Sequence, residues 1–249
     1  MKAVILRCHK GSRILFYTGL IHLILIPVFL TMMGFDDRQV NFENVWLKPL
    51  RFAFSIWLFT WTYAWFTSFT KKFRTVFNVL NHLIAINMMV EMILISFQAG
   101  RGVASHFNVQ TPFDTTIFSI MGAIIGFNAA ILGVWFLTFA FWEKEKDYYR
   151  SSIIWGMSIF LLGNLSGYLI IRYGWPTDIL GSYSKIPITG WKETLKDLKI
   201  SHAIGLHAIQ LLPISQLFIK KMGANTSLIH IAGITYLVIY FLTLFYALL

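Results

Sequence analysis

The chain has 249 residues, of which 57% are hydrophobic and only 13% are charged. A soluble domain carries roughly 25% charged residues, so this composition excludes an ordinary soluble globular protein. The formal net charge of +10 does not indicate nucleic-acid binding, because the basic residues lie in short segments between long apolar runs, where Lys and Arg set the orientation of membrane proteins.

The apolar residues occur in runs of about 20, the length of an α-helix that crosses a hydrocarbon layer of roughly 30 Å. Backbone groups in lipid must satisfy their own hydrogen bonds, which favours helices. We therefore predict an all-α, polytopic transmembrane bundle that forms a single domain over residues 1–249. Its seven expected spans lie near residues 14–33, 50–69, 76–98, 116–142, 152–173, 202–219 and 228–249.

The distribution of charge predicts the orientation of the chain. With the N-terminus in the cytoplasm and the C-terminus outside, most Lys and Arg residues fall on the cytoplasmic side, as the positive-inside rule requires. The first run is too long for a signal peptide, so we interpret it as an anchor. The predicted cytoplasmic segments include Arg7, Lys10, Arg13, Lys71, Lys72 and Arg74.

The second run is entered through Lys48 and Arg51, which add two cations at the outer boundary. They could form an anion or headgroup site together with Arg101, because a guanidinium offers a bidentate fork. Ordinary anchoring at the membrane interface is the alternative.

The third run contains a polar face. Asn87, Glu91 and Gln98 are separated by four and seven residues, so they share one side of a helix. A carboxylate within the membrane costs roughly 2.5–3.5 kcal/mol and usually faces a partner or a wet cavity. Two interpretations stay open for Glu91: a structural pair with a neighbouring helix, or a site role as proton carrier, metal ligand or substrate anchor.

The connection after this run is dense in functional groups. Gly100 and Gly102 allow the chain to turn, and Arg101, His106 and Asp114 follow within a short stretch. In the alternative interpretation Arg101 reaches lipid headgroups and Asp114 caps the next helix.

The sixth run begins with His202, and His207 and Gln210 lie deeper on a common face. The two histidines are five residues apart and would point about 140° apart on a regular helix, although Pro213 could change that angle.

Small residues predict close helix packing in two runs. Gly122 and Gly126 lie on one face of the fourth run, and Gly163 and Gly167 lie on one face of the fifth.

Three segments resemble those of a bacterial family of multi-pass membrane proteins of uncharacterised activity: Trp46–Ala53, Gln98–Asn108 with Thr111–Asp114, and His202–Gln210. The resemblance implies a bacterial inner-membrane protein and brings no activity, ligand or catalytic residue.

These features predict a polar cavity that opens to the outer side between the third and sixth spans. The first hypothesis is a membrane enzyme with a Zn or Fe ion or a haem, in which His106, His202 and His207 bind the metal and Glu91, Arg101 and Asp114 act in catalysis. The alternative is a non-catalytic binder or transporter of a small anionic or lipidic molecule, with Glu91 as a proton-coupled gate. In both cases the cavity would be lined by Asn87, Gln98, Gln210, Lys48 and Arg51.

Overall fold

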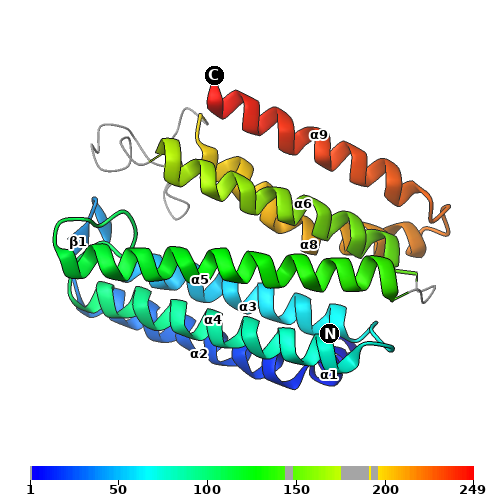
Figure 1. Ribbon diagram of the computed structural model, residues 1–249, viewed down its shortest axis with the longest axis horizontal. Coiled ribbons are helices and arrows are strands. Elements are labelled where there is room, and N and C mark those ends of the chain that lie inside the picture. The colour runs from blue at the N-terminus through cyan, green and yellow to red at the C-terminus, as the bar shows by residue number, and fades with distance from the viewer. Residues whose placement is uncertain (1, 144–147, 175–190, 192–195) are drawn as a thin grey trace. The chain divides into compact units, whose positions relative to one another are not determined.

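The computed structural model describes residues 2–143, 148–174, 191 and 196–249. The described residues are predominantly helical and include one short β-hairpin, so the predicted helical class is confirmed (Figure 1). The chain divides into two compact units, Met1–Thr138 and Phe139–Leu249.

Among the described residues, six helices are long and apolar enough to cross a membrane, which fits a multi-pass membrane protein. The helix α3 (Leu47–Thr67) is of similar length, but its two cations and many Trp, Tyr and Thr residues make it less apolar. The count of seven spans and the orientation of the chain stay predictions. The six candidate spans are Arg13–Phe35, Arg74–Gly100, Pro112–Trp142, Arg150–Arg172, Leu198–Lys221 and Leu228–Leu248.

The first unit is built from α1 (Lys2–Gly11), α2 (Arg13–Phe35), α3, α4 (Arg74–Gly100) and α5 (Pro112–Leu137), with a hairpin between α2 and α3. Its interior is aromatic. Trp135 of α5 is fully buried, and its ring lies 5.4 Å from that of Tyr63 on α3 and 5.0 Å from that of Phe77 on α4, between ring centroids. The three helices are therefore held together by one aromatic cluster.

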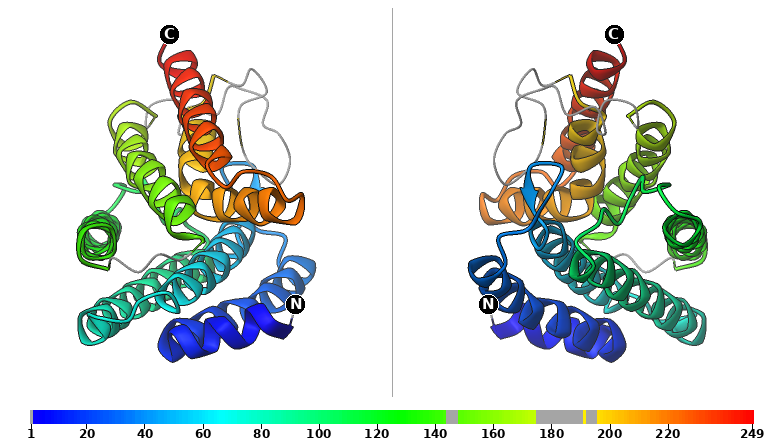
Figure 2. Two further views of the ribbon diagram at one scale, coloured as in Figure 1. Left: turned by 90° about the vertical axis from the view of Figure 1, so that its right-hand side faces the viewer. Right: turned by 90° about the vertical axis from the view of Figure 1, so that its left-hand side faces the viewer.

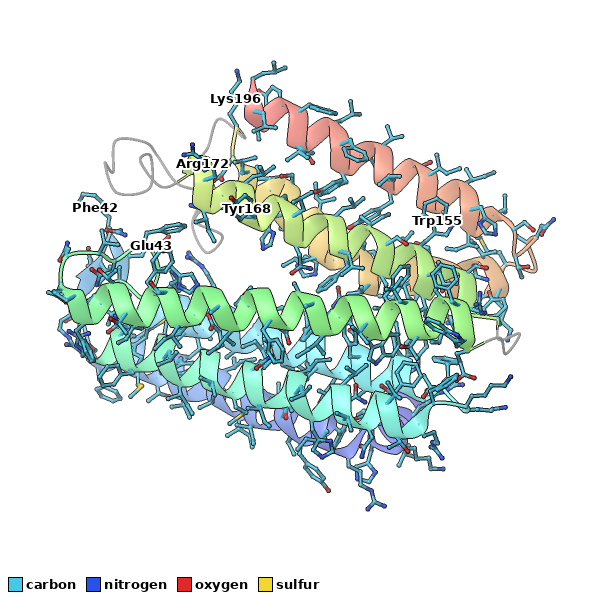
Figure 3. The ribbon with its side chains drawn as sticks, in the orientation of Figure 1. Phe42, Glu43, Trp155, Tyr168, Arg172 and Lys196 are labelled. Atoms are coloured by element: carbon cyan, nitrogen blue, oxygen red, sulfur yellow. The ribbon has the colours of Figure 1, made fainter. Side chains whose placement is uncertain are left out.

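The hairpin pairs β1 (Gln39–Val40) with β2 (Glu43–Asn44) through a two-residue turn. Asn41 and Phe42 both have positive φ, as a type I′ turn requires, and the Phe42 side chain is 81% exposed at the tip (Figure 3). Arg38 donates to the Gly100 carbonyl, which places the hairpin beside the end of α4. We call this the hairpin end of the first unit, and it faces the viewer in the right-hand view of Figure 2.

The second unit contains α6 (Arg150–Leu169), α8 (Leu198–Lys221) and α9 (Leu228–Leu248). A π-helical turn, η1 (Thr138–Trp142), follows α5, and another, η2 (Ile170–Gly174), follows α6. The helices α6 and α8 cross at Gly163 and Gly205, whose backbones touch. Tyr236 and Tyr240 of α9 donate their hydroxyl hydrogens to the carbonyls of Ile204 and Leu162, which fixes α9 against the same crossing.

The packing predicted for Gly163 and Gly167 is confirmed, since a Cβ at Gly163 would lie 2.8 Å from Gly205 and one at Gly167 would lie 2.8 Å from His202. Gly122 and Gly126 differ, because no atom of the described residues lies within 4 Å of a Cβ built at either position. Within the first unit, therefore, no helix packs closely against that second pair.

Candidate functional site

The connection between α4 and α5 is an ordered turn that folds back over the end of α4. Gly102 has a φ of +73°, and the amides of Gly102 and Val103 donate to the carbonyls of Ala99 and Gln98. This pattern is a Schellman motif, which needs a left-handed residue just after the helix and so explains the glycine. The chain thereby turns His106 back toward the α4 helix.

His106 and Glu91 meet at this turn. The Nε2 atom of His106 lies 3.8 Å from Oε1 of Glu91, and the Glu91 side chain is only 1% exposed. Neither carboxylate oxygen of Glu91 has a hydrogen-bond partner among the described residues, nor does the amide nitrogen of Asn87, one turn earlier. A buried carboxylate without hydrogen bonds is unusual, because such groups are normally satisfied. We call Glu91 and His106 the Glu91–His106 pair.

The surroundings of His106 fix the orientation of its ring. Its Nδ1 atom lies 3.1 Å from Oγ of Ser105, and Phe52 packs against the ring at 5.5 Å between centroids. When the Ser105 hydroxyl donates to Nδ1, the ring hydrogen lies on Nε2 and points toward Glu91. In that arrangement the ring nitrogen that carries the hydrogen faces the carboxylate.

Burial and the nearby ammonium of Lys48 lower the pKa of His106 well below its usual range. The imidazole is therefore neutral at pH 7. The charge of Lys48 also acts on Glu91, so one cation at the start of α3 influences both members of the pair.

The lowered pKa of His106 makes stability depend on pH. An unfolded chain binds a proton at His106 below its ordinary pKa of about 6.5, whereas the folded protein resists it, so stability is complete above that pH and falls as the pH drops further. We expect a loss of at most about 1.4 kcal/mol per pH unit from this group. Thermal unfolding in detergent at pH 7.5 and 5.5 should show a shallower pH dependence for His106→Gln than for wild type. The control His82→Gln, at an exposed position of α4, should keep the wild-type pH dependence. A His106→Gln protein whose melting temperature depends on pH as that of wild type does would contradict a role of His106 in this dependence.

Asp114 lies at the centre of a second group of hydrogen-bonded side chains, which we call the Asp114 network and which also includes Gln98, Arg101 and Thr111. Its Oδ1 atom accepts from Gln98 at 3.0 Å and from Arg101 at 2.6 Å, and its Oδ2 atom accepts from Thr111 at 2.6 Å. The Thr111 hydroxyl in turn caps α5 by accepting from the Asp114 amide. Gln98 and Asp114 are buried, and the Arg101 guanidinium also covers the ring of Phe113 at 4.8 Å. The network therefore ties the end of α4 to the start of α5.

Two further ion pairs stabilise the hairpin end. Arg51 donates to both carboxylate oxygens of Glu43 through its two terminal guanidinium nitrogens, Nη1 at 2.8 Å and Nη2 at 3.0 Å. Arg38 binds Asp36, and the Trp46 indole also donates to Asp36, so that these hydrogen bonds hold the pKa of Asp36 well below its usual range. Of the cations predicted to bind an anion, Arg51 and Arg101 are thus each paired with a carboxylate of the chain itself.

The predicted residues of the sixth run lie in the second unit. His202 contacts the Gly163 carbonyl at 2.7 Å and packs on α6, whereas His207 is exposed and points to another side of α8. Gln210 is half-buried on the same helix. The two histidines diverge as the helical spacing predicts, and Pro213 does not bring them together.

The prediction of a metal centre at His106, His202 and His207 finds no support. Among the described residues there is no group of three His, Cys, Asp or Glu side chains that could hold a metal ion. His106 instead contacts Ser105 and Glu91, and His202 contacts a backbone carbonyl.

Several residues of the hairpin end were not predicted from sequence. Asp36 and Ser105 lie in connections and Glu43 in a two-residue strand, none of them in a recognisable motif, and their partners depend on how the hairpin and the turn fold. Thr111 could have been found, since Thr-Pro-Phe-Asp has the spacing of a capping box with Pro at the first helical position.

Comparisons of the chain with protein-family models, with curated proteins and with solved structures give no match.

Proposed function

We propose that the protein is a proton-coupled binder or transporter of a small anionic molecule in the cell membrane, with the Glu91–His106 pair as its protonation site. One observation carries the proposal: Glu91 is 1% exposed, has no hydrogen bond to its carboxylate among the described residues, and lies 3.8 Å from an imidazole. Ionisable groups at such positions in membrane helices commonly belong to proton or ion pathways.

The charges around the pair favour the exchange of one proton. With one proton shared between Glu91 and His106 the pair is neutral overall, whichever residue holds it. A second proton would make the pair positive and would be opposed by the Lys48 ammonium, whereas loss of the proton leaves a carboxylate that Lys48 attracts.

The same charges connect proton binding to anion binding. When Glu91 is ionised, its negative charge partly cancels the positive potential of Lys48. Protonation of Glu91 removes this negative charge, so the local potential becomes more positive and favours a small anion. A proton and an anion would thus bind together, and each would raise the affinity for the other.

The membrane-enzyme hypothesis has less support. It requires a metal centre that the described residues do not form, and it assigns catalysis to Arg101 and Asp114, which bind each other in the Asp114 network. In our proposal these two residues position the turn that carries His106.

The proposal is tested by infrared difference spectroscopy of the purified protein between pH 8 and pH 5. We expect a carboxylic-acid C=O band that titrates in wild type, disappears in Glu91→Gln and shifts in His106→Gln, because an isolated buried acid absorbs apart from hydrogen-bonded ones. Glu43→Gln is the matched control, since Glu43 lies at the hairpin and binds Arg51 rather than His106, and it should keep the band. A titrating band that survives in Glu91→Gln would rule out Glu91 as the proton site.

A further inference from the structure

The end of the first unit opposite the hairpin carries a concentrated positive charge. The short helix α1 and the connection between α3 and α4 lie together there, in the view on the left of Figure 2. Residues 1–35 and 44–90 contain no Asp or Glu. The exposed cations of this region, which we call the basic end, are Arg7, Lys10, Arg13, Lys71, Lys72 and Arg74.

Specific contacts fix α1 on this end. A Cβ at Gly11 would lie 2.0 Å from the Ala64 carbonyl oxygen, so the glycine lets α1 touch the α3 backbone. The Cys8 thiol donates to the Trp61 carbonyl, and the Arg7 guanidinium covers the Phe69 ring at 4.1 Å. With 10 residues, α1 is about 15 Å long and is too short to span a bilayer.

The outward face of α1 is amphipathic. Val4 and Leu6 are 56% and 59% exposed, while Arg7 and Lys10 on the same helix are also exposed. Apolar and basic side chains together on an exposed short helix are typical of helices that lie in the membrane interface, with apolar groups among acyl chains and cations among headgroups. A helix of this kind fits a lipid surface better than open solvent.

We propose that the basic end binds anionic phospholipid headgroups. Polybasic segments next to a membrane are attracted to anionic lipids, and the guanidinium groups of Arg7, Arg13 and Arg74 can bind a phosphate through two hydrogen bonds. The predicted orientation places this end at the cytoplasmic leaflet. This site is separate from the Glu91–His106 pair, so neither proposal depends on the other.

The test compares two adjacent lysine pairs. Lys71 and Lys72 belong to the basic end, whereas Lys220 and Lys221, also exposed, end α8 in the second unit. The melting temperature of the detergent-solubilised protein is measured against increasing dioleoyl-phosphatidylglycerol, with dioleoyl-phosphatidylcholine and inorganic phosphate as parallel additions. We expect phosphatidylglycerol alone to stabilise wild type, and Lys71→Gln/Lys72→Gln to need roughly tenfold more of it.

The matched variant Lys220→Gln/Lys221→Gln should respond to phosphatidylglycerol as wild type does. Equal losses in the two double variants would overturn the proposal, because they would indicate a general effect of positive charge. It would equally be overturned if phosphatidylcholine stabilised as well as phosphatidylglycerol, or if inorganic phosphate reproduced the effect.

Discussion

Replacement of Asp114 with Ala is expected to lower the melting temperature of the detergent-solubilised protein by on the order of 10 °C. The carboxylate accepts hydrogen bonds from Gln98, Arg101 and Thr111, and it is 3% exposed. Its removal leaves the buried amide nitrogen of Gln98 without its acceptor and the half-buried Arg101 guanidinium without its carboxylate, which costs more than the loss of the contacts themselves. The connection that carries His106 loses its attachment to α5 at the same time.

A double-mutant cycle separates the ion pair from the rest of the network. Arg101→Gln removes the charge opposite Asp114, so the double variant Arg101→Gln/Asp114→Ala should be less destabilised than the sum of the two single variants. Asp37→Ala, at an exposed carboxylate one residue after Asp36, should leave the melting temperature nearly unchanged. Strict additivity of Arg101→Gln and Asp114→Ala would mean that the two groups do not act as a pair.

Part of the arrangement at this end of the molecule could be predicted from the sequence. Helical spacing predicted that Asn87, Glu91 and Gln98 share a face, and the structure buries all three. Asp114 was also considered as the cap of the next helix, and it does lie in the first turn of α5, but the N-cap residue is Thr111. Periodicity and the start of a helix are local properties, so the sequence alone carries the signal for both.

The partners of these residues were less predictable, because they depend on the path of the connection. His106 reaches Glu91 only because Gly102 adopts a left-handed conformation and reverses the chain. Arg51 was considered for an external anion or for anchoring at the membrane interface, and the structure pairs it with Glu43 of a hairpin with two-residue strands. Strands this short carry no periodic signal, so neither the hairpin nor its carboxylate could be anticipated.

A larger loss of stability is expected from crowding the crossing of α6 and α8. Gly205→Leu should destabilise the protein by roughly 3 kcal/mol or more, because overpacking a closed interface forces backbone movement. Even a Cβ at Gly205 would lie 2.4 Å from the Gly163 Cα and 3.1 Å from Cε2 of Tyr240. These are a backbone atom and a fully buried ring, so neither can yield as the end of a flexible side chain would.

The displacement should extend to α9, because the Tyr236 and Tyr240 hydroxyls bind the carbonyls of Ile204 and Leu162 on the two crossing helices. Separation of α6 from α8 lengthens at least one of these bonds, so Gly205→Leu should also increase amide hydrogen exchange in α9. Gly126→Ala is the matched control, since no described atom lies within 4 Å of its Cβ and Ala is the better helix former, by about 1 kcal/mol. If backbone contact occurs at this crossing, Gly205→Leu is destabilised and Gly126→Ala is not. A Gly205→Leu protein as stable as Gly126→Ala would show that the two helices do not cross at Gly163 and Gly205.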